Sequence, residues 1–109
     1  MPREMRQIMF RAPEIMAAIT EYHRRRAIVL PQGTAIGCRI TDEPALSVTL
    51  TIQGDDGTSA ELSVDAEVLA ASLILYCIHR KIPLPAEADK RLQKVGDDGV
   101  ALIVIKRLR

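Results

Sequence analysis

The 109-residue chain contains no tryptophan and no asparagine, and its only aromatic residues are Phe10, Tyr22 and Tyr76. Proteins that hold single-stranded bases or sugar rings commonly stack them on several aromatic side chains, so this scarcity argues against such sites. There are only two cysteines, Cys38 and Cys77. Small secreted domains use larger, closely spaced sets of cysteines for their disulfides, so we expect a reducing, cytoplasmic compartment.

Long hydrophobic runs and an excess of charge are also missing. The main apolar stretch, residues 68–78, is too short to cross a bilayer, which needs about 20 apolar residues, and we expect no membrane association. No apolar run of signal-peptide length follows the N-terminus, so we expect no export. Lys and Arg number 15 and Asp and Glu 14, which leaves a net charge of +1. An electrostatic partner would therefore have to bind a local patch.

The apolar stretch itself, VLAASLILYCI at residues 68–78, is the clearest feature that is present. Every residue in it except Ser72 is apolar or weakly amphipathic, so a helix here has no charged face to turn toward water. We expect a helix over residues 66–80, with Asp65 as its N-cap. The KIPLP segment at residues 81–85 cannot continue it, because its prolines lack the N–H donor. A sheet, another helix or a second copy of the chain must cover this helix.

A first helix is expected from Pro13 to about Arg26. Proline suits the first turn, Glu14 complements the helix dipole, and apolar residues recur on one face from Ile15 to Tyr22. Residues 1–12 fit either a flexible arm or an extra strand, because their apolar residues match both periods.

Three strands should follow this helix. Residues 36–40 alternate between apolar and polar side chains, and so do residues 46–53 and 60–64. The GDDG sequence at residues 54–57 predicts a hairpin turn between the last two of these strands. One face of this sheet should be apolar and the other polar.

The end of the chain predicts a short helix over residues 86–95, terminated by Gly96, and then a strand. A second GDDG at residues 96–99 forms the turn between them. The strand at residues 100–105, VALIVI, is apolar on both faces, so it should lie in the centre of a sheet or be covered by another subunit.

These elements predict a single α+β domain over residues 13–109. We expect a two-layer sandwich, with a mainly antiparallel sheet of three to four strands and the helices on one face. The element order is α-β-β-β-α-α-β, preceded by the arm at residues 1–12.

The chemistry-bearing residues do not predict a catalytic or metal site. His23, Cys38, Cys77 and His79 match a zinc site in number only, because Cys77 and His79 project from different sides of one helix. Cys77 lies among apolar residues that disfavour its thiolate, and no G-x-S-x-G motif is present. We therefore expect neither a metal nor a cofactor, and no enzymatic activity.

Basic residues cluster at the predicted helix ends, where the helix dipole alone favours them. If folding brings these clusters together, they form a phosphate-binding surface, and nucleic-acid binding is the alternative function. The residues of this predicted basic surface are Arg24, Arg25, Arg26, Arg80, Lys81, Lys90, Arg91 and Lys94.

The leading hypothesis is a small interaction or regulatory domain that forms a homodimer through apolar surface. It rests on the surplus of apolar residues in the helix at residues 66–80 and in the last strand. A chain of this size has barely enough other residues to bury both elements. A protein partner other than a second copy remains open. The residues expected to mediate self-association are Leu102, Ile103, Val104 and Ile105.

Overall fold

The structure, a computed structural model, describes residues 2–107 and belongs to the α+β class, as predicted. It contains two antiparallel three-stranded sheets where the sequence predicted one, so the prediction of a single sandwich sheet is wrong in this respect. We name β1-β6-β5 the terminal sheet and β2-β3-β4 the central sheet. The elements are β1 (Arg3–Arg11), α1 (Ala12–Arg25), β2 (Thr34–Thr41), β3 (Ser47–Gln53), β4 (Ser59–Asp65), α2 (Ala66–His79), β5 (Asp89–Val95) and β6 (Gly99–Arg107).

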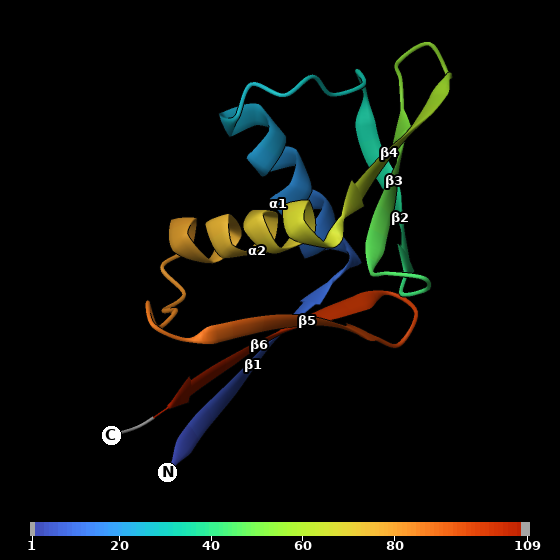
Figure 1. The fold of residues 1–109 in the computed structure, drawn as a ribbon. Helices are drawn as coiled ribbons and strands as arrows, with labels where there is room; N and C mark the ends of the chain where they lie inside the picture. The colour runs from blue at the N-terminus through green and yellow to red at the C-terminus, as the bar shows by residue number, and fades with distance from the viewer. Residues whose placement is uncertain (1, 108–109) are drawn as a thin grey trace.

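The two helices lie in the angle between the two sheets. Figure 1 shows the central sheet standing on the right, the terminal sheet along the bottom, and both helices on the same side of the terminal sheet. One continuous core fills this angle, with buried residues from both sheets and both helices. The core therefore uses one face of each sheet, and within residues 2–107 no helix lies over the opposite faces.

The central sheet follows the predicted alternation. Along β3, Val48, Leu50 and Ile52 are buried against the helices, whereas Thr49 and Thr51 lie on the opposite face. Because successive side chains of a strand point to opposite faces, this period of two places every apolar residue of β3 in the core.

The predicted start of α2 is confirmed. The side chain of Asp65 accepts a hydrogen bond from the Val68 amide at 2.9 Å, and the helix runs to His79. Leu69 and Leu73 are fully buried. Coverage is not complete, however, because Ile78 near the end of the apolar stretch is 60% exposed.

The helix predicted over residues 86–95 is wrong, because this segment forms β5. Lys90 and Leu92 face the helices, whereas Arg91 and Gln93 face away, and β6 supplies the hydrogen-bonding partner along the whole strand. Gly96 has the positive φ (+64°) expected of it, but it serves the turn of the β5–β6 hairpin and not a helix end.

The N-terminal segment forms β1, a nine-residue strand that pairs with β6 from Arg3↔Arg107 to Arg11↔Gly99. Since β5 pairs with the other edge of β6, the last strand is central in its sheet, as predicted. The two ends of the described chain lie side by side at the far end of the terminal sheet (Figure 1).

The molecule is elongated for its length. Its radius of gyration is 15.0 Å, against about 13 Å for a compact domain of this size. The longest dimension is 57 Å and the shortest 19 Å. Among residues 2–107, no helix is long and apolar enough to cross a membrane.

Candidate interaction surface

The strand register divides the terminal sheet into two chemically different faces. On the inner face, Ile8, Leu102 and Leu92 stand side by side across the three strands, and Phe10 and Val100 occupy the next such position on β1 and β6. These residues belong to the core beneath the helices. The inner face is therefore used by the fold itself.

The outer face of the terminal sheet has no covering element within the described chain. Its central positions combine Met5 with Ile105 and Gln7 with Ile103, and Met5 is 69% and Met9 46% exposed. The two isoleucines are half-buried. The residues of the outer face are Arg3, Met5, Gln7, Met9, Arg11, Asp89, Arg91, Gln93, Val95, Gly99, Ala101, Ile103, Ile105 and Arg107.

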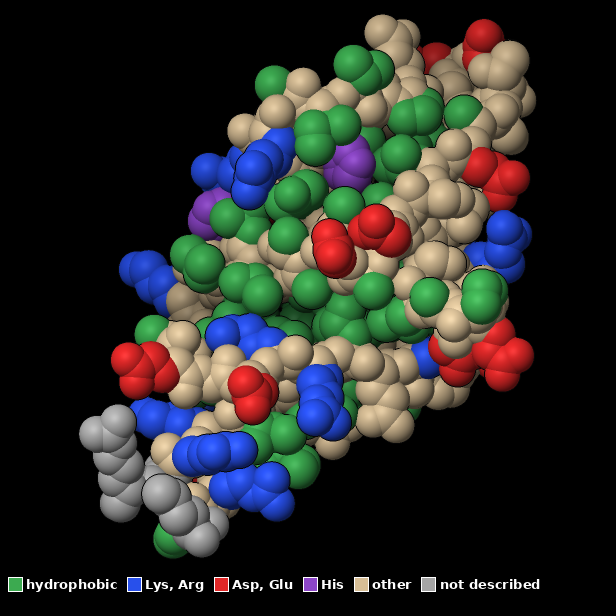
Figure 2. Space-filling model, in the orientation of Figure 1, with side chains coloured by type: hydrophobic (Ala, Val, Ile, Leu, Met, Phe, Trp, Pro, Cys, Tyr) green, Lys and Arg blue, Asp and Glu red, His purple; other side chains and the backbone are tan. Residues whose placement is uncertain are grey.

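Positive charge predominates around the apolar residues of the outer face, and Asp89 beside Ile105 is the one acidic residue among its strand positions. Arg3 and Arg107 lie opposite each other at one end, Arg11 lies at the other end, and Arg91 lies beside Ile103. Four arginines and one aspartate leave a net charge of +3 on this face. None of the guanidinium groups of these arginines forms an ion pair within 4.0 Å with a carboxylate of residues 2–107; the Glu14 carboxylate accepts only from the backbone N–H of Arg11, at 2.7 Å. Figure 2 shows several basic side chains, with acidic ones among them, over the lower part of the molecule, where the terminal sheet lies.

The four residues expected to mediate self-association are divided between the two faces. Leu102 and Val104 lie on the inner face, with exposed fractions of 0% and 1%, and cannot contact another molecule without unfolding. Ile103 and Ile105 lie on the outer face. Only these two can contribute to an interface.

Sequence reasoning missed the contribution of β1 to this surface. Met5, Gln7 and Met9 alternate with Ile8 and Phe10, and this period of two is the signal that separates an outer from an inner face. It could not be assigned because the same apolar residues also fit a helical face.

The predicted basic surface does not form as one unit. The strand β5 places Lys90 and Lys94 on the inner face and Arg91 on the outer face, because residues at odd separations point to opposite sides of a strand. The ammonium group of Lys90 also donates to the backbone carbonyls of Pro85 and Ala88, at 3.5 and 3.4 Å. These three residues therefore cannot contact one phosphate backbone together.

The other basic residues lie at the helix ends. Arg24 and Arg25 are exposed in the last turn of α1, and the Arg26 guanidinium lies 5.3 Å from the centre of the Tyr22 ring. Lys81 follows α2 in a turn, with a φ of +57°. Dipole complementarity accounts for these positions, as the sequence analysis allowed.

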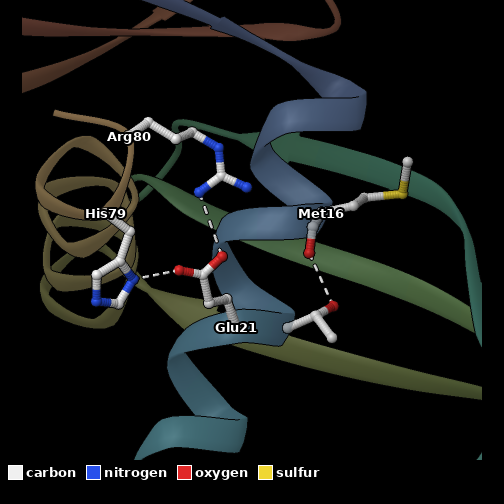
Figure 3. A network of polar contacts seen from close by, with 5 residues as sticks. Met16, Glu21, His79 and Arg80 are labelled. Atoms are coloured by element: carbon white, nitrogen blue, oxygen red, sulfur yellow. Dashed lines mark hydrogen bonds and ion pairs between the residues drawn. The ribbon is translucent and has the colours of Figure 1, made fainter. Parts of the chain in front are cut away.

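Arg80 instead belongs to a polar network that joins the two helices (Figure 3). His79 donates from Nδ1 to Glu21 Oε1, and Arg80 Nη1 lies 3.3 Å from Glu21 Oε2. The Arg80 guanidinium also lies 3.6 Å from the centre of the Tyr76 ring. The hydrogen bond from His79, assisted by Arg80, lowers the pKa of Glu21 below its usual 4.5 even though burial opposes the shift. This network fixes the C-terminal turn of α2 against α1.

A broad, open groove of about 1080 Å³ lies between α1, the loop before β2 and the central sheet. Arg24, Arg25, Gln32 and Thr34 line it, whereas two other polar side chains are engaged elsewhere: Thr20 donates to the Met16 carbonyl at 2.8 Å, and Glu21 is held by the network. A small-molecule site normally offers several polar groups that converge on the ligand. The apolar residues that line the groove are Pro13, Met16, Ala17, Leu30, Pro31, Ala35 and Ile52. The groove is thus a weaker candidate than the outer face.

The histidines and cysteines have structural surroundings. The ring of His23 hydrogen-bonds the Ile19 carbonyl at 2.8 Å, and His79 contacts Glu21. Burial raises the pKa of both thiols, and the charge of Asp98 raises that of Cys38 further. Over residues 2–107, no three side chains of His, Cys, Asp or Glu are grouped so that they could hold a metal ion.

Comparison with protein-family models, with curated proteins and with solved structures finds no match for this chain. Among the surfaces of the described chain, the outer face of the terminal sheet combines exposed apolar side chains with arginines that have no ion-pair partner within residues 2–107.

Proposed function

We propose that this protein is a small protein-interaction module whose binding surface is the outer face of the terminal sheet. The observation that carries the proposal is the exposure of Met5 and Met9 beside Ile103 and Ile105, on a face that no described part of the chain covers. A contiguous apolar patch with polar residues around it is typical of a binding surface in a soluble protein.

The composition of the face supports this proposal. Methionine and arginine are both enriched in protein interfaces, methionine because its flexible thioether adapts to different partners and arginine because its planar group makes several contacts at once. The face offers two methionines and four arginines.

The central sheet provides an internal comparison, since its outer face is also free of helices. There Thr49 and Ser63 hydrogen-bond each other at 2.9 Å, and Arg39 lies 3.6 Å from Glu61. Apart from Ile36, which is 55% exposed at the bulge of β2, the central sheet exposes polar side chains and its arginine is paired, as expected for a surface that faces water. The apolar, unpaired character of the terminal sheet is therefore not a general property of uncovered sheets in this chain.

Site-specific photo-cross-linking in the cells that produce the protein tests the proposal. The outer-face residues Gln7 and Gln93 are each replaced by p-benzoylphenylalanine, and Ser63 of the central sheet serves as the matched control. We expect discrete cross-linked products from positions 7 and 93 and none from position 63. A product of twice the 12.1 kDa of the chain identifies a second copy, and another mass identifies a different protein. The absence of products at both outer-face positions, or equal products at position 63, would refute the proposal.

A further inference from the structure

We propose that the occupant of the outer face is an amphipathic helix of a different protein, with acidic side chains along both sides of its apolar stripe. This inference rests on the proposed function and goes further, because it selects the partner. Two observations carry it: the charge of the face and its size.

The charge of the face is unfavourable for self-association. Two copies of the chain packed face to face would bring eight arginines together with only two aspartates. Like charges brought together in a desolvated interface cost several kcal/mol, whereas opposite charges steer and orient the partners. The electrostatic complement of Arg3, Arg91 and Arg107 is a carboxylate-rich surface.

The size of the face points to a small binding element. Three strands about 4.8 Å apart span about 14 Å, and nine residues at about 3.4 Å each span about 30 Å, which gives a flat footprint of about 400 Å². The footprint is a strip only about 14 Å wide, which suits a single rod-shaped element. A single helix about 10 Å in diameter, about 20 residues long at 1.5 Å per residue, fits this footprint in both directions.

The arrangement of side chains on the outer face indicates the sequence pattern expected of the partner helix. Met5, Met9, Ile103 and Ile105 form the apolar centre, so the partner helix should carry apolar residues at i, i+3, i+4 and i+7. Arginines lie at both ends and beside the centre, so Glu or Asp should occupy the positions that flank the stripe.

Two synthetic 20-residue helical peptides test the inference, with the same leucine stripe but flanks of glutamate in one and lysine in the other. Binding to the full chain is followed by fluorescence anisotropy of labelled peptide. We expect the glutamate peptide to bind at least 10-fold more tightly than the lysine peptide. The double variant Arg91→Glu with Arg107→Glu should lower the affinity for the glutamate peptide at least 10-fold. The matched charge reversal Arg39→Glu, on the central sheet, should leave its affinity within twofold.

An apolar contribution is required as well, and it separates a helix from a simple polyanion. Met5→Ser should lower the affinity for the glutamate peptide at least fivefold and leave the affinity for single-stranded DNA unchanged. If single-stranded DNA binds as tightly as the glutamate peptide and Met5→Ser affects neither, the face is a polyanion surface and the inference is overturned.

Failure of the inference is distinguishable from failure of the proposed function. If light scattering shows a dimer at micromolar concentration that Ile103→Asp dissociates, a second copy is the occupant; the inference is then wrong while the interaction module stands. Equal affinities for the two peptides would also overturn the inference alone. The absence of cross-linked products at positions 7 and 93 would refute both the proposed function and the inference.

Discussion

Leu102 and Ile103 are neighbours on β6, yet they lie on opposite faces of the terminal sheet. Leu102 stands between Ile8 and Leu92 beneath the helices and is completely buried, whereas Ile103 stands between Gln7 and Arg91 on the outer face. One residue therefore contributes to the fold and the next to the proposed interface.

This relationship predicts opposite outcomes for the same substitution at adjacent positions. Leu102→Asp places an unpaired carboxylate in the core and should cost about 4 kcal/mol or more, enough to unfold a domain of ordinary stability. Ile103→Asp should change the free energy of unfolding by no more than about 1 kcal/mol, because the new carboxylate meets water and Arg91. Urea denaturation followed by circular dichroism compares the two variants, and similar losses of stability in both would contradict the assignment of faces.

The network of Glu21 with His79 and Arg80 predicts a pH-dependent contribution to stability. Glu21→Gln should lower the free energy of unfolding at pH 7 by about 0.5–1 kcal/mol. Solvent screens the pair of Glu21 with Arg80 only in part, so its contribution lies in the upper range for surface ion pairs. The pKa of Glu21 is lower in the folded state than its usual 4.5, so its contribution is present above about pH 4.5 and is lost as the pH falls through the folded-state pKa.

The measurement is thermal unfolding of wild type and Glu21→Gln between pH 3 and pH 7. The difference in Tm should be largest near neutral pH and shrink below pH 4.5. Glu87→Gln, at an exposed position of the turn before β5 without an ion pair in the described chain, is the control and should show little difference at any pH. A difference that grows toward acidic pH would contradict the role assigned to Glu21.

Two glycines with positive φ predict very different costs for alanine. At Gly33, with φ +133°, an added Cβ would lie 2.2 Å from the Gln53 carbonyl oxygen. Gly33→Ala should therefore destabilise the protein by about 2 kcal/mol or more, because both the backbone angle and the space are unsuitable. At Gly57, with φ +85°, nothing lies within 4 Å, and Gly57→Ala should cost only the backbone strain, about 1 kcal/mol. Equal denaturation midpoints for these two variants would show that the close approach at Gly33 is not maintained.

The thiols should react slowly in the folded protein. Burial raises the pKa of Cys77 and of Cys38, so both are mainly protonated at pH 7.5, and only the thiolate is nucleophilic. Iodoacetamide labelling followed by mass spectrometry should find both slower than a free cysteine, with Cys77 modified only as fast as the protein unfolds. Asp98→Asn should speed the labelling of Cys38 and leave Cys77 unchanged, because the negative charge that raises the pKa of Cys38 is removed. Labelling of Cys77 at the rate of a free thiol would contradict its burial.

Part of this fold could be predicted from the sequence because the deciding interactions are local. The alternation along β3 assigns Val48 and Leu50 to the core without knowledge of the partner strands. A period of two between apolar and polar residues indicates a strand with one buried face. The start of α2 depends on Asp65 and an amide three residues later, and the prolines after Lys81 exclude its continuation. These features involve neighbours in the chain, so the sequence by itself determined them.

The tertiary structure decided what depends on distant partners. The segment with Lys90, Arg91 and Lys94 fits an exposed helix as well as an edge strand. It forms the strand β5 only through pairing with β6, and this pairing places Arg91 on the opposite face from the two lysines. Similarly, VALIVI at residues 100–105 is apolar on both sides, so its composition cannot tell which face the helices cover. That choice follows from the packing of α1 and α2 in the angle between the sheets. This packing leaves Ile103, together with Met5 and Met9 of β1, on a face that no element of the described chain covers.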